Sequence, residues 1–300
     1  MKRKVIKQAN QAYTITLPID WVRKNNIDKN PEVDVEISEK SLIITNKGKT
    51  EHKKISVTIP ETRGRNIGRV ITSLYAKGFD EILIKSEKDI SAEVRKSINN
   101  VIGFALVSQK EKEFIIKDIG GSNYSDLDEI FKRVFQMILS FYEAAVKDVF
   151  GQEKETMESL VSRDGEINKF CYFLERAINK MSYTDSVKGR ALFTYAFELE
   201  KIGDEIQRFW RTNIKYKVKK TKELKKFIEH SVDSLGKAFE LYFQFNIEKA
   251  EEIASSRDRL REESMELTKD KYTNRIIRHA LKIVEEATDL NQLTFMIKME

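Results

Sequence analysis

Residues 192–209 read LFTYAFELEKIGDEIQRF, and this stretch decides the fold of the larger part of the chain. At about 100° per residue, its large side chains form one narrow apolar stripe, made of Leu192, Tyr195, Leu199, Ile202, Ile206 and Phe209. Glu200 and Asp204 are four residues apart and lie roughly opposite that stripe. The stretch therefore predicts an amphipathic helix with two carboxylates on one face.

The helical pattern extends in both directions from this stretch, from Leu127 to the end of the chain. Proline breaks helices, and the prolines of the chain are Pro18, Pro31 and Pro60, all near the N-terminus. Long uninterrupted helices are therefore possible in the remainder. The pattern predicts six of them, at about 126–149, 152–180, 186–216, 222–246, 247–269 and 272–298.

The six predicted helices form two sets of three that share sequence details. The second helix of each set contains the same tripeptide, Ser162-Arg163-Asp164 in one and Ser256-Arg257-Asp258 in the other. The third helix of each set contains a glutamate four residues before an aspartate, Glu200 and Asp204, then Glu285 and Asp289. Two matches in the same order indicate a duplicated three-helix unit, with repeats at about 122–217 and 218–300.

The repeated carboxylates have two interpretations. They are acids on a solvated helix face, or they hold a cation between adjacent helices. Phe193 and Phe197 share the face of Glu200 and Asp204, and Asp164 falls within the apolar stripe of its own helix, where an unpaired carboxylate is costly. Oxygen ligands suit hard ions such as magnesium, manganese, calcium or iron. The alternative for Asp164 is an ion pair with Arg163 or Arg190.

The first sixty residues have a different pattern, of short strands and turns. Strands are expected at Lys4–Gln8 and 13–17, a short helix at 19–26 after Pro18, and a hairpin at 33–37 and 41–45. The result is a β-β-α-β-β module of about 46 residues. Its core is too small to be stable alone, so the module is expected to need a partner chain; the core residues expected are Ile15, Leu17, Val22, Val33, Val35, Ile37 and Ile43.

A third pattern lies between these two. Strands are expected at 55–59, 82–84 and 114–116, and helices around 67–75 and 94–102, which together predict a small α/β domain. Gly120-Gly121-Ser122-Asn123 then marks a boundary. The fold class expected is multidomain α+β: an N-terminal module at 1–50, the α/β domain at 51–121 and a six-helix bundle at 122–300.

The positive charge is concentrated in the N-terminal part. The chain has 54 basic and 48 acidic residues, and residues 1–50 carry +4, residues 51–120 carry +3 and residues 121–300 carry −1. A polyanion partner should therefore meet the N-terminal part. The basic residues expected to contact duplex DNA are Lys2, Arg3, Lys4, Lys7, Arg23 and Lys24.

The composition is that of a globular protein, with 40% hydrophobic and 34% charged residues. No stretch approaches the ~18–20 apolar residues of a membrane span, and no apolar run follows the basic start as in a signal peptide. A single cysteine, Cys171, excludes a disulfide within the chain and favours a reducing compartment. The cytoplasm is therefore the expected location.

The paired carboxylates on the third helix of each set resemble the PhoU family of phosphate-uptake regulators over residues 122–300. The resemblance implies a six-helix bundle whose acidic motifs bind metal clusters, with iron, manganese, magnesium or zinc as the expected ion. The implied ligands are Glu200, Asp204, Glu285 and Asp289, with Asp164 and Asp258 beside them. The second copy has Ala287-Thr288 where the first has Ile202-Gly203, so we expect it to bind more weakly.

Residues 1–46 resemble the AbrB/SpoVT swapped-hairpin family of dimeric DNA-binding modules, through Ala12–Pro18 followed by Trp21-Val22-Arg23-Lys24. Asn30-Pro31 stands where that family usually has Gly-Asp. The resemblance implies a homodimer with exchanged hairpins. The order of the three parts is similar to archaeal regulators of the PhoU type.

Two functions follow from these resemblances. One is a DNA-binding regulator of phosphate uptake or homeostasis. The other is an adaptor without DNA binding, whose bundle docks on a phosphate transporter or its signalling kinase. The charge distribution favours the first. A carboxylate-bridged metal enzyme would need Glu-x-x-His pairs, and the chain has none, so we do not expect an enzyme.

Four further features of the sequence are weaker signals. Arg63–Arg69 has glycines and arginines at a helix start, but it lacks the Gly-Lys-Ser/Thr ending of a phosphate loop. The lysine-rich run 215–226 fits either a solvated linker or a contact with an acidic partner. The histidines at 52, 230 and 279 are scattered, and we interpret them as surface or structural residues. Cys171 is expected to be a small buried side chain.

Overall fold

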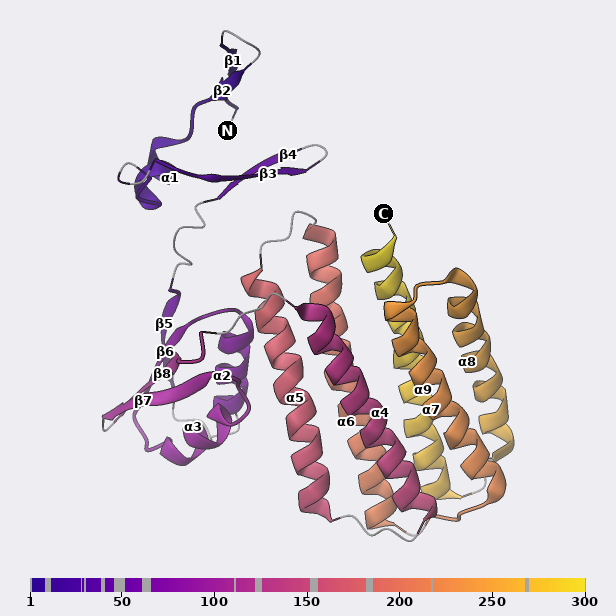
Figure 1. Ribbon diagram of the computed structural model, residues 1–300. Helices are drawn as coiled ribbons and strands as arrows, with labels where there is room; N and C mark the ends of the chain where they lie inside the picture. The colour runs from indigo at the N-terminus through magenta and orange to yellow at the C-terminus, as the bar shows by residue number, and fades with distance from the viewer. Residues whose placement is uncertain are drawn as a thin grey trace. The chain divides into compact units, whose positions relative to one another are not determined.

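The chain divides into two compact units in the computed structural model, Met1–His52 and Lys53–Glu300, and each is described by itself (Figure 1). The structure describes residues 2–8, 12–27, 29, 31–38, 41–45, 52–60, 66–110, 112–121, 126–151, 156–181, 186–216, 218–267 and 270–299. The predicted turns at 9–11 and 39–40, Asn30 before Pro31, residues 63–65 of the Arg63–Arg69 segment and Ser122-Asn123 lie outside these ranges.

The first unit has the predicted β-β-α-β-β order. Strand β1 (Val5–Lys7) pairs antiparallel with β2 (Tyr13–Ile15), and helix α1 (Ile19–Lys24) follows. Strand β3 (Asp34–Ser38) then pairs antiparallel with β4 (Ser41–Thr45). The two hairpins are separate two-stranded sheets within one chain. A closed barrel of exchanged hairpins therefore stays a prediction.

The apolar residues predicted to form the core of this unit are largely exposed in the single chain. Ile15 is 48% exposed, Val35 52% and Ile37 82%. Leu17, Val22 and Val33 are half-buried, and the side chain of Ile43 lies outside the described part. The hairpin residues lack cover in the single chain, because a lone two-stranded sheet has no second layer over its faces. That a partner chain covers them stays a prediction.

The second unit begins with a four-stranded sheet in the order β5-β6-β8-β7. Strands β5 (Lys54–Ile59) and β6 (Glu81–Ser86) are parallel and are connected through helix α2 (Ile67–Ala76). Helix α3 (Ser91–Ile98) leads to the antiparallel strands β7 (Phe104–Lys110) and β8 (Glu113–Asp118). The core of this α/β layer contains Ile71, Tyr75, Ile82, Ile84, Phe114 and Ile116, all fully buried.

Strand β7 is the element that sequence patterns did not predict. Its sequence FALVSQK lacks strict alternation, and its register with β8 shifts between Leu106 and Ser108, as at a β-bulge. It is also the last strand of the sheet in the strand order. An edge strand with one half-solvated face gives a weak periodic signal.

Six long helices form the rest of the second unit, and all six were predicted. They are α4 (Leu127–Phe150), α5 (Met157–Lys180), α6 (Ser186–Lys215), α7 (Lys222–Phe243), α8 (Ile247–Leu267) and α9 (Lys271–Lys298). Side-chain caps fix several of the starts. Thr156 accepts a hydrogen bond from Ser159 N, Thr221 from Leu224 N, and Asp270 from Tyr272 N and Thr273 N.

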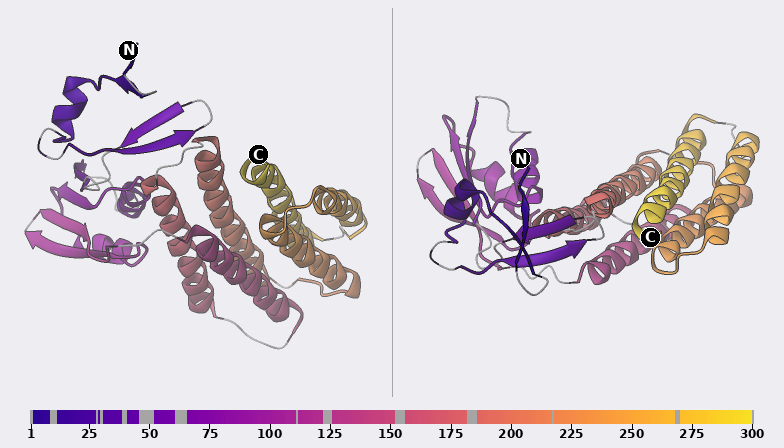
Figure 2. Two further views of the ribbon diagram at one scale, coloured as in Figure 1. Left: turned by 45° about the horizontal axis from the view of Figure 1, so that its top comes forward. Right: turned by 90° about the horizontal axis from the view of Figure 1, so that it is seen from above.

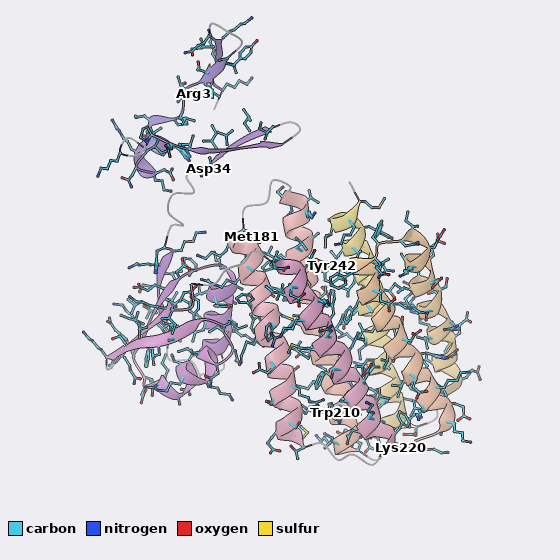
Figure 3. All side chains as sticks on the ribbon, viewed as in Figure 1. Arg3, Asp34, Met181, Trp210, Lys220 and Tyr242 are labelled. Atoms are coloured by element: carbon cyan, nitrogen blue, oxygen red, sulfur yellow. The ribbon has the colours of Figure 1, made fainter. Side chains whose placement is uncertain are left out.

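The helices pack as two equivalent sets of three. Within each set every helix contacts the other two, and the sets join through α6 with α9 and through α4 with α7 (Figure 2). Aromatic rings fill the centre; Phe135 of α4 stacks on Phe239 of α7 with ring centroids 4.4 Å apart. Figure 3 labels Met181 and Tyr242 near one end of the helices and Trp210 and Lys220 near the other. The matching helix contacts within the two sets are those that a duplicated three-helix unit requires.

The α/β layer is attached to the helices through Arg176 of α5, which is 1% exposed. Its guanidinium donates to the carbonyl oxygens of Tyr75 and Phe79 at 3.0 and 2.7 Å, and to the carboxylates of Asp80 and Asp118 at 2.7 and 2.9 Å. The same group lies 5.0 Å from the centre of the Tyr75 ring. One buried arginine therefore joins α5 to α2, to the loop before β6 and to the end of β8.

A search for membrane-crossing segments finds none among the described helices, because each is too short or too polar to cross a bilayer.

Candidate functional site

The predicted carboxylates of the first repeat lie where α5 and α6 approach each other closely. Gly203 sits at the contact, and a Cβ at that position would lie 3.1 Å from Cγ2 of Ile167. Only a residue without a side chain fits there comfortably. The glycine in Glu200-Lys201-Ile202-Gly203-Asp204 thus lets the helix that carries Glu200 and Asp204 pack tightly against α5.

Asp164 of α5 is buried at this contact, as its place in the apolar stripe predicted, with 7% of its surface exposed. Its Oδ2 accepts a long hydrogen bond of 3.4 Å from Asn168, and its Oδ1 has no hydrogen-bond partner. Burial, together with the charges of Asp204 and Glu200, raises the pKa of Asp164 to about 7. The ion pair with Arg163 or Arg190 that the sequence left open does not form within the described structure.

Glu200 and Asp204 are half-buried, which disagrees with the first of the two interpretations, a fully solvated face. Tyr172 of α5 donates to Glu200 Oε1 at 3.4 Å, and Arg208 donates to Asp204 Oδ2 at 2.6 Å. Burial and the charge of Asp204 raise the pKa of Glu200. These two carboxylates therefore face α5 and interact electrostatically with Asp164.

Glu175 is a fourth acid of this cluster, and the sequence reasoning missed it. It lies three turns along α5 from Asp164, is 6% exposed, and its Oε1 has no hydrogen-bond partner. Burial and the charge of Glu200 raise its pKa to about 7. Its spacing of eleven residues from Asp164 was the available signal, because eleven residues make three helical turns. We call Asp164, Glu175, Glu200 and Asp204 the α5–α6 acidic cluster.

Cys171 lies in the same contact and is fully buried, which confirms the expectation for it. Burial raises the pKa of its thiol well above the ordinary range, and the charges of Glu200, Glu175 and Asp164 act in the same direction. The thiol is therefore protonated and unreactive at neutral pH.

The chemistry of the α5–α6 acidic cluster suits a hard cation. Its donors are carboxylate oxygens, two of them buried and without a partner. Within the ranges that the structure describes, however, no three His, Cys, Asp or Glu side chains are grouped closely enough to hold an ion. The cluster has the right donors in an open arrangement, and metal binding stays a prediction.

In the second copy of the motif, an arginine side chain supplies positive charge to the glutamate. Arg261 of α8 donates to Glu285 of α9 through two nitrogens, at 3.0 and 2.7 Å, and Asp258 pairs with Arg257 at 2.8 Å. Asp258 and Asp289 are exposed. Counting from the aligned aspartates Asp164 and Asp258, Arg261 takes the place of Ile167. An arginine thus neutralises the glutamate here, whereas the first copy has an isoleucine.

A buried polar network between α6 and α9 was not predicted at all. Glu205 is 2% exposed; it pairs with His279 Nδ1 at 2.6 Å, and Arg208 and Lys282 lie at 2.7 and 3.3 Å from its other oxygen. Burial alone would raise the pKa of Glu205, but these partners outweigh it and hold the pKa at about 2. His279 therefore has a structural role, which is one of the two interpretations, surface or structural, that the sequence allowed.

The six basic residues predicted to contact DNA are all exposed in the first unit. None of them forms an ion pair with an acid in the part of the chain that the structure describes. They come from the segment before β1 and its strand, namely Lys2, Arg3, Lys4 and Lys7, and from the end of α1, namely Arg23 and Lys24. The unit presents these charges without internal neutralisation.

The lysine-rich run spans the connection between α6 and α7. Tyr216 in this run stacks on Tyr272 of α9 with centroids 4.5 Å apart, and Arg275 lies 5.8 Å from the Tyr216 ring. Lys225 pairs with Glu229 at 3.6 Å. The run is therefore anchored by aromatic contacts at the end of the bundle.

Comparisons with known proteins give one distant similarity. No model of a protein family matches the chain, and no curated protein matches it. Among solved structures, the crystal structure of the phosphate transport system regulatory protein PhoU from Streptococcus pneumoniae is similar to it, with a TM-score of 0.48 and 17% sequence identity. The similar region covers 59% of this chain and 95% of that one. Neither a shared family nor a shared function follows from a similarity of this size.

Proposed function

We propose that the protein is a DNA-binding regulator of phosphate uptake or homeostasis that acts in the cytoplasm. The DNA-binding part of the proposal is carried by the first unit, which presents six exposed basic residues, none of them paired with a carboxylate among the described residues. The phosphate part rests on the sequence resemblance of residues 122–300, with its repeated acidic motifs, to phosphate-uptake regulators. No catalytic activity is proposed.

The first unit acts as a homodimer in this proposal. The exposed apolar side chains on both of its hairpins, Val5, Ile6, Ile15, Val35, Ile37 and Leu42, give a partner chain a surface to cover. A second copy with exchanged hairpins would bury these faces and would double the basic residues on one surface. Light scattering at micromolar concentration should show a dimer, and a monomer would contradict this part.

The DNA proposal is tested with the double variant Arg3→Ala/Arg23→Ala. Its affinity for random duplexes should fall to a similar degree for every sequence, because the contacts are to phosphates. The slope of log affinity against log salt should decrease by about one unit per contact removed. The matched control is Arg257→Ala, an arginine of the bundle that pairs with Asp258. Unchanged affinity and slope in the double variant would favour the adaptor that docks on a transporter or kinase.

The bundle is proposed to bind a hard cation at the α5–α6 acidic cluster, through Asp164, Glu200 and Asp204. Support comes from the unpartnered Asp164 Oδ1, and from burial and the charges of Asp204 and Glu200, which together raise the pKa of Asp164 to about 7. Arg208 pairs with Asp204, and a bound cation would supply positive charge to the unpartnered oxygen of Asp164. In the second copy Arg261 already supplies such a charge to Glu285, so Glu285, Asp289 and Asp258 should bind metal weakly or not at all.

Metal binding is tested with Asp204→Asn, and the matched control is Asp289→Asn in the second repeat. Elemental analysis and calorimetry with manganese, magnesium and iron(II) should show loss of binding for the first variant and little change for the second. Circular dichroism should show that neither variant unfolds. The same result for both variants, or no stoichiometric metal in the natural protein, would contradict the proposal.

A further inference from the structure

The groove between α4 and α5 has binding features that neither the DNA surface nor the acidic cluster uses. It has a volume of about 490 Å³ and is lined by both helices. Sites for small molecules typically have volumes of about 300–1,000 Å³. Two arginines line the groove, Arg133 from α4 and Arg163 from α5, and both are exposed.

Neither arginine is neutralised by an acid. The guanidinium of Arg133 lies 4.7 Å from the centre of the Phe170 ring, and that of Arg163 lies 6.0 Å from the Trp210 ring. Neither forms an ion pair in the part of the chain that the structure describes. Glu166, the acid among the lining residues, pairs with Lys169 at 2.7 Å. Aromatic contacts thus hold both guanidinium groups while their N–H donors stay available.

The rest of the lining is part polar and part apolar. Ser140 and Ser162 contribute exposed hydroxyl groups from the two helices. Phe141 and Ile167 are buried at the floor of the groove, and Met137 is half-buried. A ligand that matches this lining has a negatively charged group to face the arginines and an apolar body to face the floor of the groove.

The corresponding groove of the second set, between α7 and α8, has the opposite character. It is lined by Glu248, Glu251 and Glu252. Its two cations have acidic neighbours: Lys237 pairs with Asp233 at 3.2 Å and Arg259 with Glu263 at 3.8 Å. The free arginines are therefore a property of the first groove and not of the three-helix unit.

We propose that the α4–α5 groove binds a phosphate monoester with an apolar or aromatic body. A phosphate monoester carries nearly two negative charges at neutral pH, which matches two guanidinium groups. Arginine binds phosphate through paired, charge-assisted hydrogen bonds. The apolar floor then accounts for the ester body, which inorganic phosphate lacks. The proposal is independent of metal and DNA binding.

Calorimetry on the full chain tests this proposal, with phenyl phosphate as the probe and inorganic phosphate and phenol as comparisons. Phenyl phosphate should bind once per chain and at least about tenfold more tightly than either comparison, because each of them lacks one of the two interactions. Arg133→Gln/Arg163→Gln should lower the affinity at least about tenfold. The matched control Lys237→Gln/Arg259→Gln should leave it within about twofold, since it changes a distant groove.

A second variant keeps the test valid if the double variant does not fold. Ser140→Glu places a carboxylate at an exposed helix position in the groove, where it should pair with the arginines and prevent anion binding. The proposal would be overturned if phenyl phosphate did not bind, or if inorganic phosphate bound as tightly. It would also be overturned if the double variant and its control lost the same affinity, or if Ser140→Glu left binding unchanged. If vesicles that contain phosphatidic acid compete with phenyl phosphate, the natural ligand is a lipid headgroup. If they do not compete, the natural ligand is a soluble phosphate ester.

Discussion

Glu175 shows most directly what burial does to a single side chain in this protein. It is nearly inaccessible to solvent, one of its oxygens has no partner, and it lies close enough to Glu200 to be repelled by it. Its protonated form is therefore favoured up to about pH 7. In the unfolded chain, the same carboxyl loses its proton near its ordinary pKa of 4.5.

This difference predicts a pH-dependent stability. Because the folded state holds the proton more tightly, the free energy of unfolding should decrease as the pH rises from about 4.5 to about 7. Glu175→Gln removes the titration. It should raise the free energy of unfolding by about 1–3 kcal/mol at pH 8 with chelator present, and by much less at pH 4.5. Urea denaturation at the two pH values measures this, and the exposed Glu166→Gln is the control. An equal effect at both pH values would contradict the assignment.

Sequence patterns gave the identities of the site residues better than their surroundings. Asp164 was expected to be buried because it falls in an apolar stripe, and it is. For Glu200 the sequence left open whether its face is solvated, because only one stripe of its helix was considered. Helix α6 contacts α4, α5 and α9, so faces outside that stripe are covered as well. Glu175 and Glu205 were missed for the same reason: partners on other helices cannot be identified from one helix alone.

The contact between α5 and α6 depends on the absence of a side chain at Gly203. Alanine normally stabilises a helix interior by about 1 kcal/mol relative to glycine. At Gly203 the new Cβ would lie 3.1 Å from a methyl group of the buried Ile167, whereas at Gly165 of α5 no atom lies within 4 Å of the corresponding position. The same substitution should therefore have different effects on two packed helices.

We expect Gly165→Ala to raise the free energy of unfolding by about 0.5–1 kcal/mol, and Gly203→Ala to give no gain or a loss. Chemical denaturation of both variants measures the difference. If Gly203→Ala stabilised the protein as much as Gly165→Ala, the close contact with Ile167 would not limit the approach of the helices.

The helices themselves could be predicted nearly to their ends. Their stripes of large apolar residues are long, and Thr156, Thr221 and Asp270 cap the starts of α5, α7 and α9. Strand β7 could not be predicted, because a bulge interrupts the alternation of its residues and because it lies at a sheet edge. The exposure of Val35 and Ile37 could not be predicted either, since alternation gives a face but not what covers it.

At the scale of the whole molecule, Arg176 is a buried contact that joins the α/β layer to the helices. It binds two backbone carbonyls and two carboxylates of the layer, and Lys180 adds a second contact to Asp80 at 2.6 Å. No sequence pattern pointed to it. A basic residue near the end of an amphipathic helix looks like a surface residue until its partners, 58 to 101 residues earlier, are known.

Arg176→Met should lower the free energy of unfolding by about 3–5 kcal/mol, because Asp118 would be left partly buried without the counter-charge of Arg176, and Asp80 would keep only Lys180. Hydrogen exchange of the amides in β5–β8 should accelerate more than that of the helices. The control Lys169→Met removes an exposed pair with Glu166 and should cost less than about 1 kcal/mol. Equal acceleration throughout the second unit would argue against a specific attachment.

The burial of Cys171 has a practical consequence. A chain with one thiol, and that one protonated and shielded, is already a background in which cysteines introduced elsewhere can be labelled selectively. A fluorophore placed on the first unit and another on α8 would need no prior removal of the natural cysteine. Energy transfer between the two dyes could then follow how the two units move relative to each other when DNA, metal or a phosphate ester is added.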